Sequence, residues 1–182
     1  MQIDFLLAYY CAPTLYGLKP SNLILHETDN TTDDDCELTE TLLSRGIKML
    51  KMRSCSKRTL TLVYDEKRLE MVLADAEVSA FLASRGYTND HSVTEKLTIL
   101  KHRMRKETDF PHEVGVFLGY PMTDVRGFIE HKGKHCKYCG YWKVYGDVDD
   151  AKQRFNTFTA VRDELLRHLQ HGTKLTEIIK SA

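Results

Sequence analysis

The chain has 182 residues, a length that suits one folded domain and allows about 70% of the unfolded surface to be buried. It contains 26 Lys and Arg residues and 26 Asp and Glu residues, so no long-range field draws a polyanion or an anionic membrane to it. We therefore expect no nucleic-acid binding and no membrane association. The five cysteines show no disulfide framework, which is typical of a protein in the reducing cytoplasm.

The N-terminal stretch predicts a short helix and no targeting segment. MQIDFLLAYYCAPT has an acid at Asp4, no basic region and only a short apolar run, so we expect neither a signal peptide nor a membrane span. Apolar residues at helical spacing predict a helix over residues 2–10. We expect this helix to break at Cys11, Ala12 and Pro13, because proline disrupts a helix interior.

Strands and helices are predicted in alternation after this helix. Residues 22–26 predict a short strand, and residues 37–51 predict a helix whose apolar residues fall on one face. Residues 60–65 are apolar and β-branched and predict a second strand. One helix, or two nearly continuous helices, is predicted over 66–85, and a capping box at Ser92–Glu95 opens the next helix.

The stretch from Phe110 to Gly146 contains the only tryptophan and is the expected floor of a site. Its apolar run over 113–119 predicts a buried strand. Thr123 predicts the cap of a helix from Asp124 to about His131, and residues 141–145 predict another strand. Strand, helix and strand in this order are typical of a βαβ unit, whose loops often carry function.

The sequence thus predicts an α/β fold in a single domain over residues 1–182. About six helices are expected to cover a small sheet, and the longest begins at Asp147 and ends at Gly172. The sheet is expected to contain about four strands, near residues 22–26, 60–65, 113–119 and 141–145.

A cysteine and a histidine that are distant in the sequence predict a catalytic pair. A cysteine nucleophile needs a thiolate, which a nearby imidazole supplies, and Cys11 precedes His112 in the order seen in papain-like hydrolases. Cys11 does not begin a long helix that would lower its pKa, so a buried structural thiol is the alternative interpretation. Glu113, next to His112, is the third candidate catalytic residue.

Polar and aromatic residues at turns and strand ends are candidate ligand contacts. Lys19 and the helix start at Asp124 can hold an anionic group. The aromatic cluster around Trp142 and Lys143 predicts either a platform for a flat ligand or core packing. The candidate ligand-binding residues are Lys19, Asn22, Tyr120, Asp124, Trp142 and Lys143.

Cys136 and Cys139 have the spacing that places two thiolates on one tetrahedral metal ion, with His131 or His135 as a further donor. The same spacing fits a redox pair or ordinary loop residues. Because the sequence offers no second pair of comparable ligands, we predict no metal site. The sequence identifies no cofactor.

Three blocks and the helix that follows them resemble one family. The blocks are CAPTLYGLKPSNL at 11–23, FPHEVGVFLGYPMTDVRGFI at 110–129 and GYWKVYGD at 140–147. With them the chain resembles a bacterial domain-of-unknown-function family of anaerobes over nearly its whole length. The resemblance implies no particular activity, but the family's genes lie near genes for ferrous-iron transport and flavodoxin, which implies a link to iron or redox physiology. The family positions are Cys11, Pro13, Lys19, Asn22, His112, Glu113, Gly119, Tyr120, Pro121, Asp124, Gly140, Trp142, Lys143 and Tyr145.

Two functional hypotheses follow. In the first, the chain binds a small molecule, or acts on one by Cys/His chemistry. The pocket is then built from Cys11, Lys19, Asn22, His112, Glu113 and Asp124. In the second, the chain is a non-enzymatic interaction module, and the aromatic and basic surface of Trp142 and Lys143 docks onto a protein partner.

Overall fold

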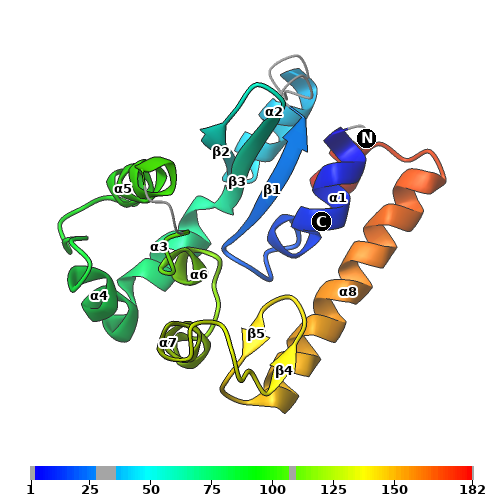
Figure 1. Cartoon of the computed structure of the whole chain (residues 1–182). Helices are drawn as coiled ribbons and strands as arrows, with labels where there is room; N and C mark the ends of the chain where they lie inside the picture. Colours follow the sequence, from blue (N-terminus) through cyan, green and yellow to red (C-terminus); the bar gives the residue numbers. More distant parts are fainter. Residues whose placement is uncertain (1–2, 28–35, 107–109, 182) are drawn as a thin grey trace. The chain divides into compact units, whose positions relative to one another are not determined.

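The computed structural model describes residues 3–27, 36–106 and 110–181. The chain divides into two compact units: unit 1 is Met1–Arg68 with Phe158–Ala182, and unit 2 is Leu69–Thr157. Helices and antiparallel strands occur together, so the predicted α/β class is confirmed (Figure 1). The single domain over residues 1–182 stays a prediction.

Unit 1 is built on a three-stranded antiparallel sheet in the order β1-β3-β2 (Figure 1). Its strands are β1 (Ser21–Glu27), β2 (Ile47–Ser54) and β3 (Arg58–Asp65). Ser21 pairs with Tyr64 at one end of the ladder between β1 and β3, and Glu27 pairs with Arg58 at the other. The strands predicted over 22–26 and 60–65 are therefore confirmed.

Three helices of unit 1 pack against this sheet and against one another: α1 (Ile3–Leu15), α2 (Cys36–Ser44) and α9 (Leu175–Ser181). α1 contacts β1 and β3, while α2 contacts β2 and α9. Their apolar side chains form one core cluster with Ile24, Ile47 and Val63 of the sheet and with Leu165 and Leu169 of α8 (Val148–Gln170). Burial of these side chains supplies the main stabilisation of unit 1.

The helix predicted over residues 37–51 is wrong in its second half. α2 ends at Ser44, and Gly46 has a φ of 73°, a left-handed conformation that terminates the helix. β2 begins at Ile47 and pairs with β3. The apolar residues of this stretch fit a helix and a strand alike, so only the pairing with β3 decides between the two.

The predicted helix break at Cys11, Ala12 and Pro13 is also wrong. α1 continues to Leu15 with Pro13 inside the helix. The Pro13 carbonyl accepts hydrogen bonds from the backbone N–H groups of Leu18 and Lys19, at 2.7 and 3.1 Å. The chain therefore turns after the proline and not at it.

Unit 2 consists of short helices and one β-hairpin: α3 (Glu66–Ala74), α4 (Ala76–Ala83), α5 (Val93–Lys106), α6 (Val114–Phe117), α7 (Met122–Glu130), β4 (Tyr138–Cys139) and β5 (Lys143–Val144). The first residues of α3 belong to unit 1. The two nearly continuous helices predicted over 66–85 are confirmed, and Asp75 separates them and caps α4 through two backbone N–H groups. The capping box is confirmed as well, because Ser92 and Glu95 each accept the other's backbone N–H.

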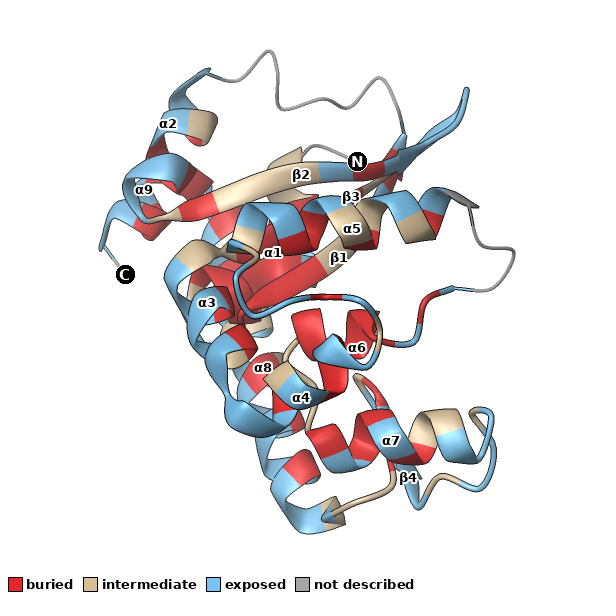
Figure 2. Ribbon diagram, turned by 90° about the vertical axis from the view of Figure 1, so that its left-hand side faces the viewer, coloured by how far each residue is buried: buried red, intermediate tan, exposed pale blue. Residues whose placement is uncertain are grey.

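The strand predicted over residues 113–119 is wrong. These residues form α6 and the turn after it, and Figure 2 shows α6 in the colour of buried residues. A short buried apolar run has no period that separates a strand from a helix. The predicted βαβ unit is therefore wrong too. β4 and β5 form an antiparallel hairpin instead, and β5 lies within the strand predicted over 141–145.

The helix predicted from Asp147 is confirmed as α8. The Asp147 carboxylate accepts the backbone N–H groups of Asp149 and Asp150, and Gly172 follows the helix with a φ of 86°. Among the described residues, none of the helices combines the length and the apolar character needed to cross a membrane.

Candidate functional site

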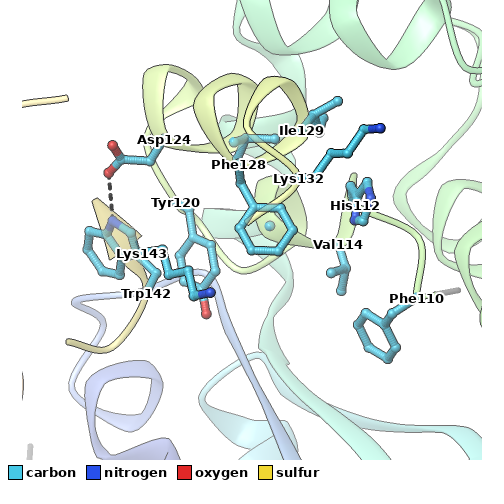
Figure 3. Close-up of a pocket in the computed structure, with 12 residues that line it drawn as sticks. Phe110, His112, Val114, Tyr120, Asp124, Phe128, Ile129, Lys132, Trp142 and Lys143 are labelled. Carbon is cyan, nitrogen blue, oxygen red and sulfur yellow. Dashed lines mark hydrogen bonds between the residues drawn. The ribbon is translucent and has the colours of Figure 1, made fainter. Parts of the chain in front are cut away.

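Unit 2 contains a cavity of about 770 Å³, a size that accepts a small organic ligand. Most of its wall is apolar or aromatic, and the polar groups are few. Its walls come from the segment before α6, from α6 and α7, and from the hairpin (Figure 3). The lining residues are Phe110, His112, Val114, Gly115, Tyr120, Asp124, Val125, Phe128, Ile129, Lys132, Trp142 and Lys143.

The turn between α6 and α7 shapes one wall. The Tyr120 N–H donates to the Gly115 carbonyl at 2.9 Å, and Gly119 has a φ of 72°, which permits the tight turn. A Cβ on Gly115 would lie 3.2 Å from the Tyr120 ring, so the glycine lets the tyrosine pack closely. Pro121 precedes the first residue of α7 and makes no side-chain cap, so the predicted cap at Thr123 is wrong.

Asp124 joins α7 to the hairpin. Its carboxylate is buried and accepts three hydrogen bonds: from Trp142 Nε1 at 2.6 Å and from the backbone N–H groups of Tyr145 and Gly146 at 2.7 Å each. The Trp142 ring is thereby fixed and stacks on Tyr120 with centroids 5.0 Å apart (Figure 3). The carboxylate is committed to these internal donors, so Asp124 holds the wall of the cavity.

Phe128 lies between the two basic ends of the cavity (Figure 3). The His112 ring makes an edge contact with Phe128 at 5.4 Å between centroids, and Lys143 Nζ lies 5.9 Å from the Phe128 centroid. Lys143 Nζ also donates to the Gly133 carbonyl at 2.7 Å. Lys132, the third basic residue, has a φ of 50°, which is unusual for a residue other than glycine.

The balance of charge at the cavity is positive. Among the described residues that line it, Lys132 and Lys143 contribute ammonium groups and His112 an imidazole, whereas Asp124 contributes the one carboxylate, whose hydrogen bonds come from three internal N–H groups. Burial raises the pKa of Tyr120 to about 12, so its phenol stays protonated at neutral pH. The cavity therefore combines an apolar floor with basic groups at its edges.

Five of the predicted site residues line this cavity: His112, Tyr120, Asp124, Trp142 and Lys143. Glu113 does not line it, although it follows His112 directly. The Glu113 carboxylate is buried, accepts Arg103 Nη1 at 2.6 Å and accepts the Tyr87 hydroxyl at 3.2 Å. These contacts connect α5 to the start of α6. Of the two neighbouring residues, only His112 lines the cavity.

Cys11, Lys19 and Asn22 lie in unit 1, and all three are buried. Burial raises the pKa of the Cys11 thiol, and Lys19 nearby only partly offsets this effect. Burial also lowers the pKa of Lys19 to about 8. Asn22 Oδ1 accepts the Thr14 hydroxyl at 2.6 Å. A protonated, enclosed thiol has the properties of a packing residue, so nothing in this geometry supports a nucleophilic Cys11.

Cys136 and Cys139 flank the start of the hairpin. Cys139 is exposed in β4 opposite Lys143, and Cys136 is half-buried. His131 stacks on Tyr145 at 5.6 Å between centroids, and its centroid lies 6.3 Å from that of His135. Within residues 3–27, 36–106 and 110–181, no group of three or more His, Cys, Asp and Glu side chains is placed to hold a metal ion.

Sequence reasoning missed several lining residues, namely Phe110, Val114, Phe128, Ile129 and Lys132. Val114 falls within the wrongly predicted strand over 113–119, and the others carry no motif of their own. One signal was present nevertheless. Residues 131–146 contain four lysines and two histidines but no Asp or Glu, an uneven distribution in a chain with no net charge.

The comparisons with known proteins identify a family and nothing further. No curated protein and no solved structure matches the chain. The family described as "Protein of unknown function (DUF3793)" matches residues 7–179, which confirms the resemblance to a domain-of-unknown-function family. The chain therefore belongs to the DUF3793 family.

Proposed function

We propose that the chain is a small-molecule-binding protein and that its binding site is the cavity of unit 2. The observation that supports this most strongly is the cavity itself, about 770 Å³ in volume, with several aromatic side chains in its lining. Binding pockets for small molecules are typically concave and mostly apolar, with a few convergent polar groups. The cavity has each of these features.

The aromatic residues favour a ligand with a flat apolar part. Tyr120 is stacked on Trp142, and Trp142 meets Phe155 edge to face with centroids 4.4 Å apart. The Trp142 indole is held by Asp124 as well, so this wall is preorganised. A rigid aromatic wall binds a flat ligand without first losing side-chain entropy.

The exposure of Trp142 favours this proposal over an interaction module. Trp142 is only 7% exposed, its ring packs against Tyr120 and Phe155, and its indole N–H donates to Asp124. An aromatic anchor of a protein interface must be accessible to the partner before binding. Trp142 serves better as a wall of a cavity than as such an anchor.

A neutral aromatic dye tests the proposal. N-phenylnaphthylamine gains fluorescence in apolar surroundings, and we expect saturable binding of one dye per chain. Ile129→Trp fills the cavity with a larger side chain and should weaken binding at least about tenfold, a change of about 1.4 kcal/mol. Phe128→Ala removes part of the wall and serves as a second variant.

Met71→Trp is the matched control, because Met71 is 63% exposed on α3 and does not line the cavity. This variant should bind the dye as the wild type does. The proposal is wrong if the wild type shows no saturable binding, or if Met71→Trp weakens binding as much as Ile129→Trp.

A further inference from the structure

We infer that the ligand carries an acidic oxygen group, a carboxylate or a phosphate, which is attracted by the basic residues at the edges of the cavity, Lys132, Lys143 and His112. This inference rests on the proposed function and specifies the class of ligand: an organic anion with a flat apolar body.

The two lysine side chains have N–H groups that make no hydrogen bond within the described residues. Of the three N–H groups of Lys143, one donates to the Gly133 carbonyl, and no other acceptor lies within hydrogen-bond distance among the described residues. The Lys132 ammonium makes no hydrogen bond or ion pair within the described part of the chain. Hydrogen bonds between an ammonium and an anionic oxygen are about twice as strong as neutral ones, so these donors favour an anion over a neutral polar group.

Within the described residues, Asp124 is the one acid that lines the cavity, and its carboxylate already accepts three internal hydrogen bonds. Residues 131–146, which supply both lysines, contain no Asp or Glu. Among the described lining residues the two lysines outnumber the single carboxylate, and a bound anion would balance the excess positive charge.

The backbone at Lys132 points to the same site. The Gly133 N–H bonds to the Phe128 carbonyl at 2.8 Å and the Lys132 N–H to the Ile129 carbonyl at 3.2 Å, which is the Schellman pattern at the end of α7. In this pattern the left-handed position usually belongs to glycine, but here Lys132 occupies it with a φ of 50°. Lys132 also lines the cavity, and a residue held in a sparsely populated backbone conformation beside a cavity is a candidate functional residue.

Two dyes with one skeleton test this inference. Anilinonaphthalene sulfonate carries an anionic group that N-phenylnaphthylamine lacks. We expect the wild type to bind the sulfonate at least about tenfold more tightly than the neutral dye, and we expect added salt to reduce this preference. Lys132→Met and Lys143→Met should each remove most of the preference and leave the affinity for the neutral dye nearly unchanged.

Lys134→Met is the matched control, because Lys134 is exposed in the same loop and does not line the cavity. This variant should keep the preference for the sulfonate dye over the neutral dye. Lys132→Gly is a second variant that suits the left-handed backbone, so it folds at least as readily as the wild type and should still lose the preference. Competition with naphthoate, naphthyl phosphate and naphthol then separates the two acids: the stronger of the first two identifies the headgroup, and naphthol should compete least.

The outcomes are distinct. Equal affinity for both dyes in the wild type, or an equal loss in Lys134→Met and Lys132→Met, would overturn the inference and leave the proposed function standing. Failure of the neutral dye to bind would overturn the proposed function and this inference with it.

Discussion

Both units bury polar residues that the sequence marks as candidates, but the surroundings of these residues differ. In unit 1, Cys11, Lys19 and Asn22 are enclosed among packed side chains. In unit 2, Asp124 is equally buried, yet it fixes the wall of a cavity bordered by exposed basic groups. In this chain, the buried polar residue beside a cavity, Asp124, shapes a candidate site, whereas Cys11, which does not line that cavity, packs into the core.

Alkylation of the cysteines tests the enclosure of Cys11 and has the largest expected effect. Cys55 is exposed, and backbone hydrogen bonds at Lys57 and Arg58 lower its pKa, so it should react fastest with iodoacetamide at neutral pH. Cys11 is fully buried and its pKa is raised, so it reacts only when unit 1 opens, roughly 1,000-fold more slowly. Peptide mass spectrometry measures both rates, and a Cys11 rate equal to or above that of Cys55 would restore the nucleophile hypothesis.

Asp124→Ala tests the frame of the cavity. The change leaves three donors without an acceptor, the buried Trp142 Nε1 and two half-buried backbone N–H groups, and we expect a loss of about 4 kcal/mol in the free energy of unfolding. Asp124→Asn keeps an acceptor for the backbone N–H groups and should lose less. Asp150→Ala removes an exposed carboxylate and should change the stability by less than about 0.5 kcal/mol. Equal losses in Asp124→Ala and Asp150→Ala would show that Asp124 does not hold the wall.

Arg103→Met tests the role of Glu113 as a structural carboxylate. The variant leaves the buried Glu113 without its cation, for an expected loss of about 3 kcal/mol measured by urea unfolding. The double variant Arg103→Met with Glu113→Leu should regain part of the loss, because no unpaired charge is then buried. If Glu113 were instead a group of the site, its replacement alone would abolish dye binding while the stability stayed constant.

The pH dependence of stability tests the enclosure of Lys19 and has the smallest expected effect. Burial lowers the pKa of Lys19 to about 8 from its ordinary 10.5, so between these values the unfolded chain binds more protons than the folded one. Stability therefore rises with pH in this window. Between pH 7 and pH 9 the wild type should gain about 1 kcal/mol relative to Lys19→Met. Parallel curves for the two proteins would mean that Lys19 stays hydrated in the folded state.

Local signals predicted a large part of the fold. The capping box at Ser92 and Glu95, the cap at Asp147 and the β-branched strand over 60–65 depend on neighbours in the sequence, so the sequence was sufficient for them. The failures are at residues 113–119 and 47–51, where a helix and a strand fit the apolar pattern equally well and distant partners decide.

The candidate site could be predicted in position but not in detail. The stretch from Phe110 to Gly146 does border the cavity, because its glycines and aromatic residues permit close packing. The roles of Asp124 and Glu113 could not be predicted, since a carboxylate looks the same in the sequence whether it faces a ligand or accepts internal N–H groups. Lys132 was missed because its position depends on a left-handed backbone conformation. Glycine usually adopts this conformation, so a lysine in the sequence does not predict it.

The most direct test of the binding site uses the indole N–H resonance of Trp142, the only tryptophan of the chain. Trp142 lines the cavity and its indole N–H donates to Asp124, so a ligand in the cavity changes the surroundings of this one proton. In isotope-labelled protein titrated with naphthoate, we predict that the indole resonance shifts progressively to saturation together with the backbone amides of Phe128 and Lys132. A stationary indole resonance, with shifts confined to residues outside the cavity, would contradict the account.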